Sequence, residues 1–204
     1  MKIICIGRNY ALHAKEMGSD LPKKPIFFLK PDTALLRNNE PFYYPDFSNE
    51  IHYEVEIVLR ISKMGKNISE KFAHRYFNEI GIGIDFTARD LQREAKEKGL
   101  PWATAKAFDF SAPISPTFIP KDQFQDIYNI DFHLEKNGKT VQKGNTKDLI
   151  FKFEFLISYI SKFITLRTGD LIFTGTPQGV GPVAIGDNLK AYIHDQLLLD
   201  FDIK

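Results

Sequence analysis

The strongest constraint on the fold comes from residues 51–59, where apolar and polar side chains alternate. A period of two predicts a β-strand, because successive side chains of a strand point to opposite faces. One face is then mostly apolar, and the other carries His52, Glu54 and Glu56. Like charges ~6.6 Å apart between Cα atoms repel unless a cation lies between them. Two interpretations follow: an ordinary strand with a solvated acidic face, or part of a divalent-metal site.

A second alternating run, residues 79–86, bears on that choice. Its isoleucines and Phe86 share one face, and Gly81, Gly83 and Asp85 share the other. Interior glycines weaken a strand but leave room for a ligand or a neighbouring backbone. Asp85 therefore stands at the end of a cleared face. There it either binds a metal or helps to cap the helix that follows, and the local sequence leaves both open.

Glu54, Glu56 and Asp85 together would form an all-oxygen ligand set. Such a set prefers Mg²⁺ or Mn²⁺, and Ca²⁺ less so, whereas Zn²⁺ prefers a His and Cys pattern that does not accompany these residues. Three carboxylates leave about three of the six positions around Mg²⁺ for water or substrate. Lewis-acid catalysis needs such an open coordination sphere. Three carboxylates and one divalent ion still carry one net negative charge, so an anionic substrate also needs nearby cations.

Side chains that follow Asp85 are candidates for the part of the site that faces the substrate. Lys106 has apolar and small neighbours, which suits an active-site cation or a lysine whose alkyl chain lies along the surface. Arg89 and Gln92 are three residues apart in a predicted helix, so both can face one site. A solvated helix surface is the alternative for this pair.

A short helix predicted at residues 10–17 carries His13 and Glu16 three residues apart. Side chains at this spacing are neighbours, and a carboxylate beside an imidazole selects its tautomer and raises its basicity. An acid–base pair needs both effects, although an ordinary surface pair looks the same in the sequence. The polar residues 18–24 follow, so the segment 9–20 is predicted to move as a lid.

Residues 174–182 are rich in glycine and follow a predicted strand. Backbone N–H groups freed by glycine turns, such as that of Gly175, and threonine hydroxyls, such as that of Thr176, can bind a carboxylate. The segment lacks the Gly-Lys-Ser/Thr ending of a phosphate-binding P-loop. A plain glycine turn is the alternative.

The remaining pattern predicts a protein built mainly of strands. Further strands are predicted at residues 2–6, 26–29, 132–136, 140–142, 171–174, 189–193 and 197–203, and further helices at 69–77, 87–98 and 148–164. Asn137-Gly138 predicts a tight hairpin turn. Thr87 is predicted to open its helix with a capping box, and Asn9 to cap the helix at 10–17.

Composition narrows the class of protein. The 204 residues are 43% hydrophobic and contain no linker-like segment, so one domain over residues 1–204 is expected. The formal charge is +1, without long blocks of either sign, which predicts neither a nucleic-acid nor a membrane-surface partner. The lone Cys5 excludes an intrachain disulfide, and no apolar stretch approaches the ~20 residues of a membrane span. The first apolar run is too short for a signal peptide, so we predict a cytoplasmic location.

Taken together, these segments resemble the fumarylacetoacetate hydrolase family, and most of all its short acylpyruvase and oxaloacetate decarboxylase branch. The resemblance runs in order along nearly the whole chain, through residues 7–16, 28–31, 52–56, 85–92, 99–106 and 174–182. The chain is too short to include the N-terminal domain of fumarylacetoacetase itself. The resemblance implies an α+β fold that is predominantly β, a mixed β-sandwich or roll with short helices, usually a homodimer.

The resemblance also implies roles for single residues. Glu54, Glu56 and Asp85 match the metal carboxylates, His13 and Glu16 match a dyad carried by a lid, and Lys106 matches the active-site lysine. Positions close to the substrate are matched by Arg89, Gln92 and Thr176, with Gly175 beside them.

The implied reaction is hydrolysis, dependent on Mg²⁺ or Mn²⁺, of a carbon–carbon bond in an acylpyruvate such as acetylpyruvate or fumarylpyruvate. Pyruvate and a carboxylic acid are the products. Oxaloacetate decarboxylation or keto–enol isomerisation at the same site is the near alternative. All of these substrates are small anionic 2-keto acids. A non-catalytic β-rich binding module with a solvated acidic face is the distant alternative.

Overall fold

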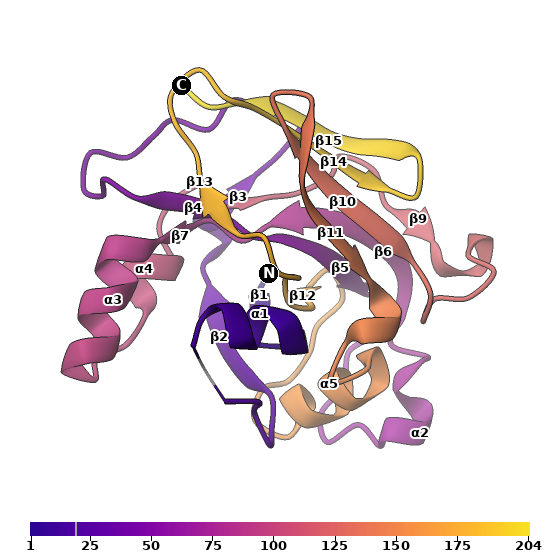
Figure 1. Ribbon diagram of the computed structural model, residues 1–204. Coiled ribbons are helices and arrows are strands. Elements are labelled where there is room, and N and C mark those ends of the chain that lie inside the picture. The colour runs from indigo at the N-terminus through magenta and orange to yellow at the C-terminus, as the bar shows by residue number, and fades with distance from the viewer. Residues whose placement is uncertain (19) are drawn as a thin grey trace.

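The computed structural model describes residues 1–18 and 20–204 and has a mixed, mostly β architecture (Figure 1). The largest sheet has six strands in the order β2 (Ile26–Lys30), β1 (Ile3–Gly7), β12 (Leu171–Phe173), β5 (Val55–Ile61), β6 (Phe77–Ile84) and β9 (Ile119–Pro120). In this sheet β1 pairs with β12 in parallel, and the other neighbours are antiparallel. The predominantly β fold predicted from the sequence is confirmed.

A second sheet has four strands in the order β11 (Lys139–Asn145), β10 (Asp131–Lys136), β14 (Asn188–Ile193) and β15 (Gln196–Asp202). Two smaller sheets join β13 (Gly181–Pro182), β4 (Ile51–Tyr53) and β7 (Thr87–Ala88), and β3 (Leu35–Leu36) with β8 (Ala112–Pro113). The hairpin of β10 and β11 turns at Asn137-Gly138, as predicted.

The helices are short and decorate the sheets. They are α1 (Ala11–Glu16), α2 (Glu70–Ala73), α3 (Arg89–Lys98), α4 (Ala103–Lys106) and α5 (Phe153–Ser161), with 3₁₀ helices at Asp32–Ala34, Lys121–Gln123 and Thr146–Asp148. Helices α2 and α5 lie together in one place, and α3 and α4 in another (Figure 1). Within the part of the chain that the structure describes, no helix is both long and apolar enough to cross a bilayer.

The two large sheets pack against each other around the main apolar core. Residues 55, 57, 59 and 61 of β5 and 80, 82 and 84 of β6 contribute their side chains to it, with Leu134, Leu189 and Phe201 from the other sheet. The opposite face of β5 carries Glu56 and Val58, and Val58 belongs to a second, smaller apolar cluster with Phe173. The alternation at residues 51–59 is therefore confirmed. The interpretation of its acidic face as solvated is wrong, because Glu54 and Glu56 are only 5% and 1% exposed.

Gly83 shows why β6 carries interior glycines. A Cβ atom there would lie 2.6 Å from the ring of Phe173 and 2.9 Å from the carbonyl oxygen of Pro113. Of the two occupants predicted for the cleared face, a ligand or a neighbouring segment, the structure shows the second.

Two predicted helices are shorter than their sequence pattern. At residues 69–77 only α2 is helical, and Phe77 already begins β6. At residues 148–164 only α5 is helical, and Leu149 instead pairs with Tyr10 in an isolated β-bridge. In both segments most of the periodic apolar residues are buried in the core, although Phe72 and Phe163 are exposed. Sheet pairing takes the backbone groups of Phe77 and Leu149.

Neither predicted helix cap is present. Helix α3 begins at Arg89 without a side-chain cap, and the hydroxyl of Thr87 donates to the carbonyl oxygen of Asp85 at 3.3 Å. Helix α1 also lacks a side-chain cap, because the side chain of Asn9 bonds to distant segments. The predicted end of α3 at Gly99 is confirmed by a left-handed φ of 65°. Of the polar residues predicted after α1, Ser19 lies outside the described residues.

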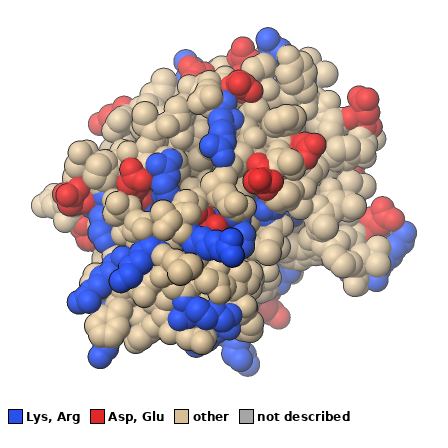
Figure 2. Space-filling view, turned by 180° about the vertical axis from the view of Figure 1, so that it is seen from behind, with Lys and Arg blue, Asp and Glu red and all other residues tan. Residues whose placement is uncertain are grey.

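Charged side chains of both signs are scattered over the face opposite to that of Figure 1, with uncharged surface between them (Figure 2).

Candidate active site

Three buried carboxylates meet where β5 and β6 run side by side. Glu54, Glu56 and Asp85 each offer an oxygen within 4.8 Å of those of the other two, and they are at most 5% exposed. The strand register causes this meeting, since Glu56 pairs with Gly83 and the N–H of Asp85 donates to the carbonyl oxygen of Glu54 at 2.8 Å. The sequence therefore predicted correctly which carboxylates come together.

Three cationic side chains touch this carboxylate cluster. Lys106 Nζ, in α4, lies 2.8 Å from Glu54 Oε2 and 2.7 Å from Asp85 Oδ2. Arg89, the first residue of α3, is ion-paired with the other oxygen of Glu54. The third cation is Lys30, which is paired with Asp85. Three positive charges therefore face the three negative charges of the carboxylates.

Lys30 is the cation that sequence reasoning missed. It is fully buried at the end of β2, with its Nζ atom 2.7 Å from Asp85 Oδ1 and 2.9 Å from both oxygens of Ser111. Its sequence signal was a lysine at the end of an apolar strand, just before a proline. With these three cations included, the site carries a net positive charge when a divalent ion is bound. The three carboxylates and the ion alone carry one net negative charge.

Burial and neighbouring charges shift the pKa in opposite directions at Glu54 but in the same direction at Glu56. Burial would raise the pKa of Glu54, but Lys106 and Arg89 hold that pKa well below its usual range. The pKa of Glu56 is raised instead, by burial and by the negative charges of Asp85 and Glu54. For Lys106, burial lowers the pKa, but Asp85 and Glu54 raise it above the ordinary value, so the amine stays charged. Of the two glutamates, Glu56 is thus the one whose charged form an added cation would stabilise more.

A hard divalent ion fits this donor set. All three residues offer carboxylate oxygens, the ligands that Mg²⁺ and Mn²⁺ prefer. Asp85 Oδ1 lies close to Lys30 but lacks the alignment of a hydrogen bond, so this buried oxygen keeps a free lone pair. The residues that would hold the ion are Glu54, Glu56 and Asp85.

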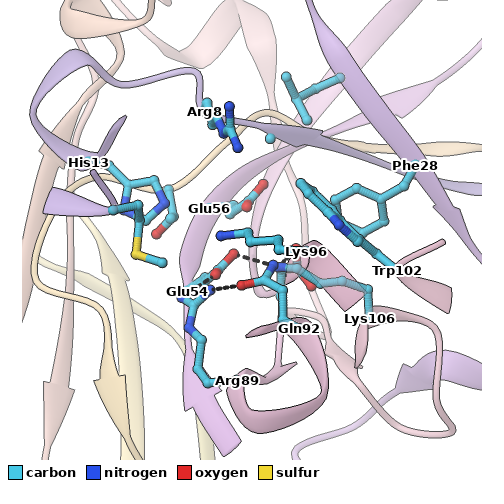
Figure 3. Close-up of a pocket in the computed structure, with 15 residues that line it drawn as sticks. Arg8, His13, Phe28, Glu54, Glu56, Arg89, Gln92, Lys96, Trp102 and Lys106 are labelled. Carbon is cyan, nitrogen blue, oxygen red and sulfur yellow. Dashed lines mark hydrogen bonds and ion pairs between the residues drawn. The ribbon is translucent and has the colours of Figure 1, made fainter. Parts of the chain in front are cut away.

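The pocket over the cluster is small, about 40 Å³. Figure 3 shows Glu54 and Glu56 near its middle, His13 on one side and Lys106 with Trp102 on the other. Arg89, Gln92 and Thr176 also line it, so the pocket brings together nearly all residues that the sequence predicted for the site. Arg8, Lys96 and the aromatic pair Phe28 and Trp102 line it as well, and sequence reasoning did not select them.

The glycine-rich segment after β12 binds carboxylates of the protein itself. The N–H of Gly175 donates to Glu56 Oε2 at 2.7 Å, and the N–H of Gly179 donates to Glu16 Oε1 at 3.0 Å. Gly175 has a φ of 106°, and a Cβ atom there would lie 2.7 Å from that of Asn9. The N–H of Gly175 is therefore already bonded to Glu56. The contact of Gly175 with the substrate stays a prediction.

Side-chain amides hold the loop and the start of α1 in place. Asn9 donates to the carbonyl oxygens of Thr174 and Phe151 and accepts from the N–H of Phe151. Gln142 donates to Thr176 Oγ1 at 3.0 Å and accepts from the N–H of Val55 at 2.9 Å. These bonds connect segments that are far apart in the sequence, which is why sequence reasoning did not find them.

His13 and Glu16 form the predicted pair on α1. His13 Nδ1 lies 3.3 Å from Glu16 Oε2, and His13 is buried. A carboxylate only accepts hydrogen bonds, so Nδ1 carries the proton and Nε2 is free to accept one in the neutral ring. Burial lowers the pKa of His13, although Glu54 and Glu16 oppose this effect, so the ring is neutral near pH 7. A neutral, oriented imidazole in a pocket with a metal-ligand set is suited to proton transfer.

A sheet-rich fold with a buried carboxylate triad and an adjacent acid–base pair defines an enzyme site of the metal-dependent kind. The chain matches the family described as "Fumarylacetoacetate (FAA) hydrolase C-terminal" over residues 2–203, and it belongs to this family.

Its relatives differ in the activity that their names state. The chain is 45% identical to the mitochondrial oxaloacetate tautomerase FAHD1 of Arabidopsis thaliana, covering 100% of this chain and 91% of the relative. It is 47% identical to the mitochondrial oxaloacetate decarboxylase of Dictyostelium discoideum, covering 94% and 88%. Among solved structures, the fumarylpyruvate hydrolase of Pseudomonas aeruginosa, in complex with Mn²⁺ and pyruvate, is 38% identical, with a TM-score of 0.93 and coverage of 100% and 89%.

Proposed function

We propose that this protein is a metal-dependent enzyme that moves a proton on small 2-keto acids, with keto–enol tautomerisation of oxaloacetate as its first activity. The observation that carries the proposal is the position of His13, whose Nδ1 lies 3.3 Å from Glu16 Oε2, in the pocket of the carboxylate triad. The oxaloacetate names of the relatives at 45% and 47% identity support the choice of substrate. Sequence reasoning had put acylpyruvate hydrolysis first.

Mg²⁺ or Mn²⁺ held by Glu54, Glu56 and Asp85 would act as a Lewis acid toward the 2-keto oxygen and the adjacent carboxylate of the substrate. Lys106 and Arg89 add positive charge beside these ligands. Positive charge fixed in this way stabilises the negative charge that develops on the keto oxygen when a proton leaves the neighbouring carbon.

His13 is the base in the proposed reaction. In the keto-to-enol direction its Nε2 atom takes a proton from C3 of oxaloacetate, and the electron pair of that C–H bond forms the C2–C3 double bond. The imidazolium ion then gives this proton to the C2 oxygen, so the composition is unchanged and His13 is neutral again. Glu16 stabilises the imidazolium ion that forms, because its carboxylate accepts the Nδ1 proton in a hydrogen bond.

Hydrolysis of acylpyruvates is the second candidate, and the likeness to a fumarylpyruvate hydrolase supports it. Here His13 takes the proton from a water molecule that attacks the 4-keto carbon. The C3–C4 bond then breaks, and its electron pair stays with the pyruvate fragment, which gains a proton. Decarboxylation of oxaloacetate is the third candidate and needs no base, because the C3–C4 bond breaks with release of CO₂.

A turnover panel with His13→Gln as the key variant tests these assignments. The purified enzyme is assayed with oxaloacetate, acetylpyruvate and fumarylpyruvate, with Mg²⁺, with Mn²⁺ and after chelation. We expect tautomerisation to be the fastest reaction, and His13→Gln to lower tautomerisation and hydrolysis by about 10²- to 10⁴-fold while decarboxylation persists. Tautomerisation that is intact in this variant would remove His13 from the mechanism, and a wild-type enzyme inactive on all three acids would refute the proposed function.

Four further properties predicted from the sequence are also proposed for this protein. They are the homodimer, the cytoplasmic location, the mobile lid at residues 9–20 and the single domain.

A further inference from the structure

Two cationic side chains of the pocket, Arg8 and Lys96, have no part in the chemistry described above. Both line the pocket that contains Glu54, Glu56 and Asp85. Figure 3 shows them directed toward its interior from different sides, Arg8 from just beyond β1 and Lys96 from α3. Their charges therefore act on whatever the pocket binds.

Neither cation has a carboxylate partner among residues 1–18 and 20–204. Lys30, Arg89 and Lys106 are paired with Asp85 and Glu54, while Glu56 accepts a hydrogen bond from the N–H of Gly175. Among the residues that the structure describes, neither the Arg8 side chain nor the Lys96 ammonium group has a hydrogen bond or ion pair, and Lys96 Nζ lies 5.9 Å from the centre of the Trp102 ring. The pocket thus holds two positive charges beyond those that neutralise its own acids.

These charges are crowded together. Burial lowers the pKa of Lys96, and the positive charges of Arg8 and Arg89 lower it further. Like charges that converge on a pocket without protein partners are a common arrangement for binding an anion. Because the triad side of the pocket would hold the keto and carboxylate oxygens, the surplus charge is free for a second anionic group.

The backbone at Arg8 supports a role for its side chain. Arg8 has a φ of 59°, in the left-handed region that glycine adopts most easily. The next residue, Asn9, is held by three side-chain hydrogen bonds to distant segments, so this conformation is imposed by the fold. An unfavourable backbone conformation at a charged residue that lines a pocket is the kind of outlier from which function is inferred.

We propose that Arg8 and Lys96 bind the distal carboxylate of a dicarboxylic 2-keto acid, and so make the enzyme prefer dianionic over monoanionic substrates. The inference rests on the proposed function, because it takes the 2-keto acid end of the substrate to lie at the triad. The guanidinium group of Arg8 presents a planar pair of N–H donors that matches a carboxylate, and Lys96 adds a point charge. Oxaloacetate has such a second carboxylate, and acetylpyruvate has a methyl ketone instead.

Single substitutions at the two residues test this preference. Arg8→Asn removes the charge but keeps a residue that tolerates a positive φ, so the variant should fold. Lys96→Gln removes the other charge from an exposed helix position. Each change should raise the KM for oxaloacetate by about ten- to a hundredfold, the range expected for a lost hydrogen bond to a charged group. The KM for acetylpyruvate should change by no more than about twofold.

Matched controls come from the same helix. Arg93→Gln and Lys98→Gln each remove a positive charge from α3, where Arg93 is paired with Glu50 and Lys98 with Glu94 on the surface. Neither control should alter the ratio of the two KM values. Arg8→Lys should recover part of the preference for oxaloacetate. An equal loss with both substrates in Arg8→Asn or Lys96→Gln would overturn the proposal, because it would mean that these residues support the reacting end.

A binding measurement separates this inference from the proposed function. The Mn²⁺-loaded protein is titrated calorimetrically with oxaloacetate and with 2-oxobutyrate, which carries a methyl group in place of the distal carboxylate. We expect oxaloacetate to bind more tightly, and both variants to abolish most of that difference. If both acids bind equally well to the wild type, only this inference fails. If neither binds, the proposed function fails with it.

Discussion

The carboxylate triad and the His13–Glu16 pair line one pocket, but the fold holds them in different ways. Glu56 lies within the paired strand β5, and Asp85 is bonded through its N–H to the carbonyl oxygen of Glu54. The pair is carried by α1, which has six residues and no side-chain cap, and the side chain of Glu16 is 36% exposed. The carboxylate triad therefore belongs to the core sheet, whereas the His13–Glu16 pair is carried by a short helix whose Glu16 is partly exposed. Substitutions should separate ion binding from proton transfer.

The largest effect is expected for Glu56→Gln. Loss of a ligand should abolish stoichiometric Mn²⁺ binding and lower turnover by about 10³-fold, since Lewis-acid stabilisation is worth several kcal/mol. The metal-free protein should melt at the same or a higher temperature, because glutamine removes a charge that Asp85 and Glu54 repel. Metal analysis, turnover and thermal melting measure the three outcomes.

Glu79→Gln is the control for this change, since Glu79 lies on β6 and pairs with Arg60 away from the pocket. It should leave metal content and turnover unchanged. Full Mn²⁺ content in Glu56→Gln would show that this carboxylate is no ligand.

The next largest effect is expected for His13→Gln, which changes the His13–Glu16 pair and leaves the carboxylate triad intact. Tautomerase turnover should fall by about 10²- to 10⁴-fold because the base is lost. Mn²⁺ binding should be retained, since His13 is not one of the three carboxylate ligands. Parallel measurements of turnover and of Mn²⁺ affinity test the separation, and a large loss of affinity would contradict it.

A smaller effect is expected for Glu16→Gln. The amide still accepts from His13 and Gly179 through its oxygen, but it no longer stabilises an imidazolium ion by charge. Groups that orient a catalytic or metal-bound side chain are worth about 10- to 100-fold, so turnover should drop by that factor. Steady-state kinetics should place this loss in kcat, and a pure KM effect would speak against an orienting role.

The smallest effect is a shift in pH dependence. Burial lowers the pKa of His13 below its ordinary 6.5, so kcat/KM should be flat through neutral pH and fall only below pH 6.5, as the ring gains a proton. Glu16 raises that pKa, so Glu16→Gln should move the fall to still lower pH. Profiles at saturating Mn²⁺ test the sign, and a shift toward higher pH would exclude His13 as the titrating base.

Only part of the triad has a local cause in the sequence, because Asp85 meets the two glutamates through the register of β5 and β6. A period of two places Glu54 and Glu56 on one face, and glycine alternation placed Asp85 at the end of the partner strand. The supporting residues could not be predicted in the same way. Gln142 accepts from the N–H of Val55, 87 residues away, and that contact depends on the order of strands in space. Lys30 likewise reaches Asp85 only because β2 lies in the same sheet as β5 and β6.

The glycine loop after β12 has a consequence for biosynthesis. Glu16 leaves the ribosome 163 residues before Gly179, and Glu56 leaves it 119 residues before Gly175. Both glutamates therefore wait for their main-chain donors until residues 175–179 have been synthesised, while chains fold from the N-terminus as they emerge. A nascent chain that stops short of these glycines lacks Thr176 in the pocket and the two main-chain donors, so it cannot form the complete site.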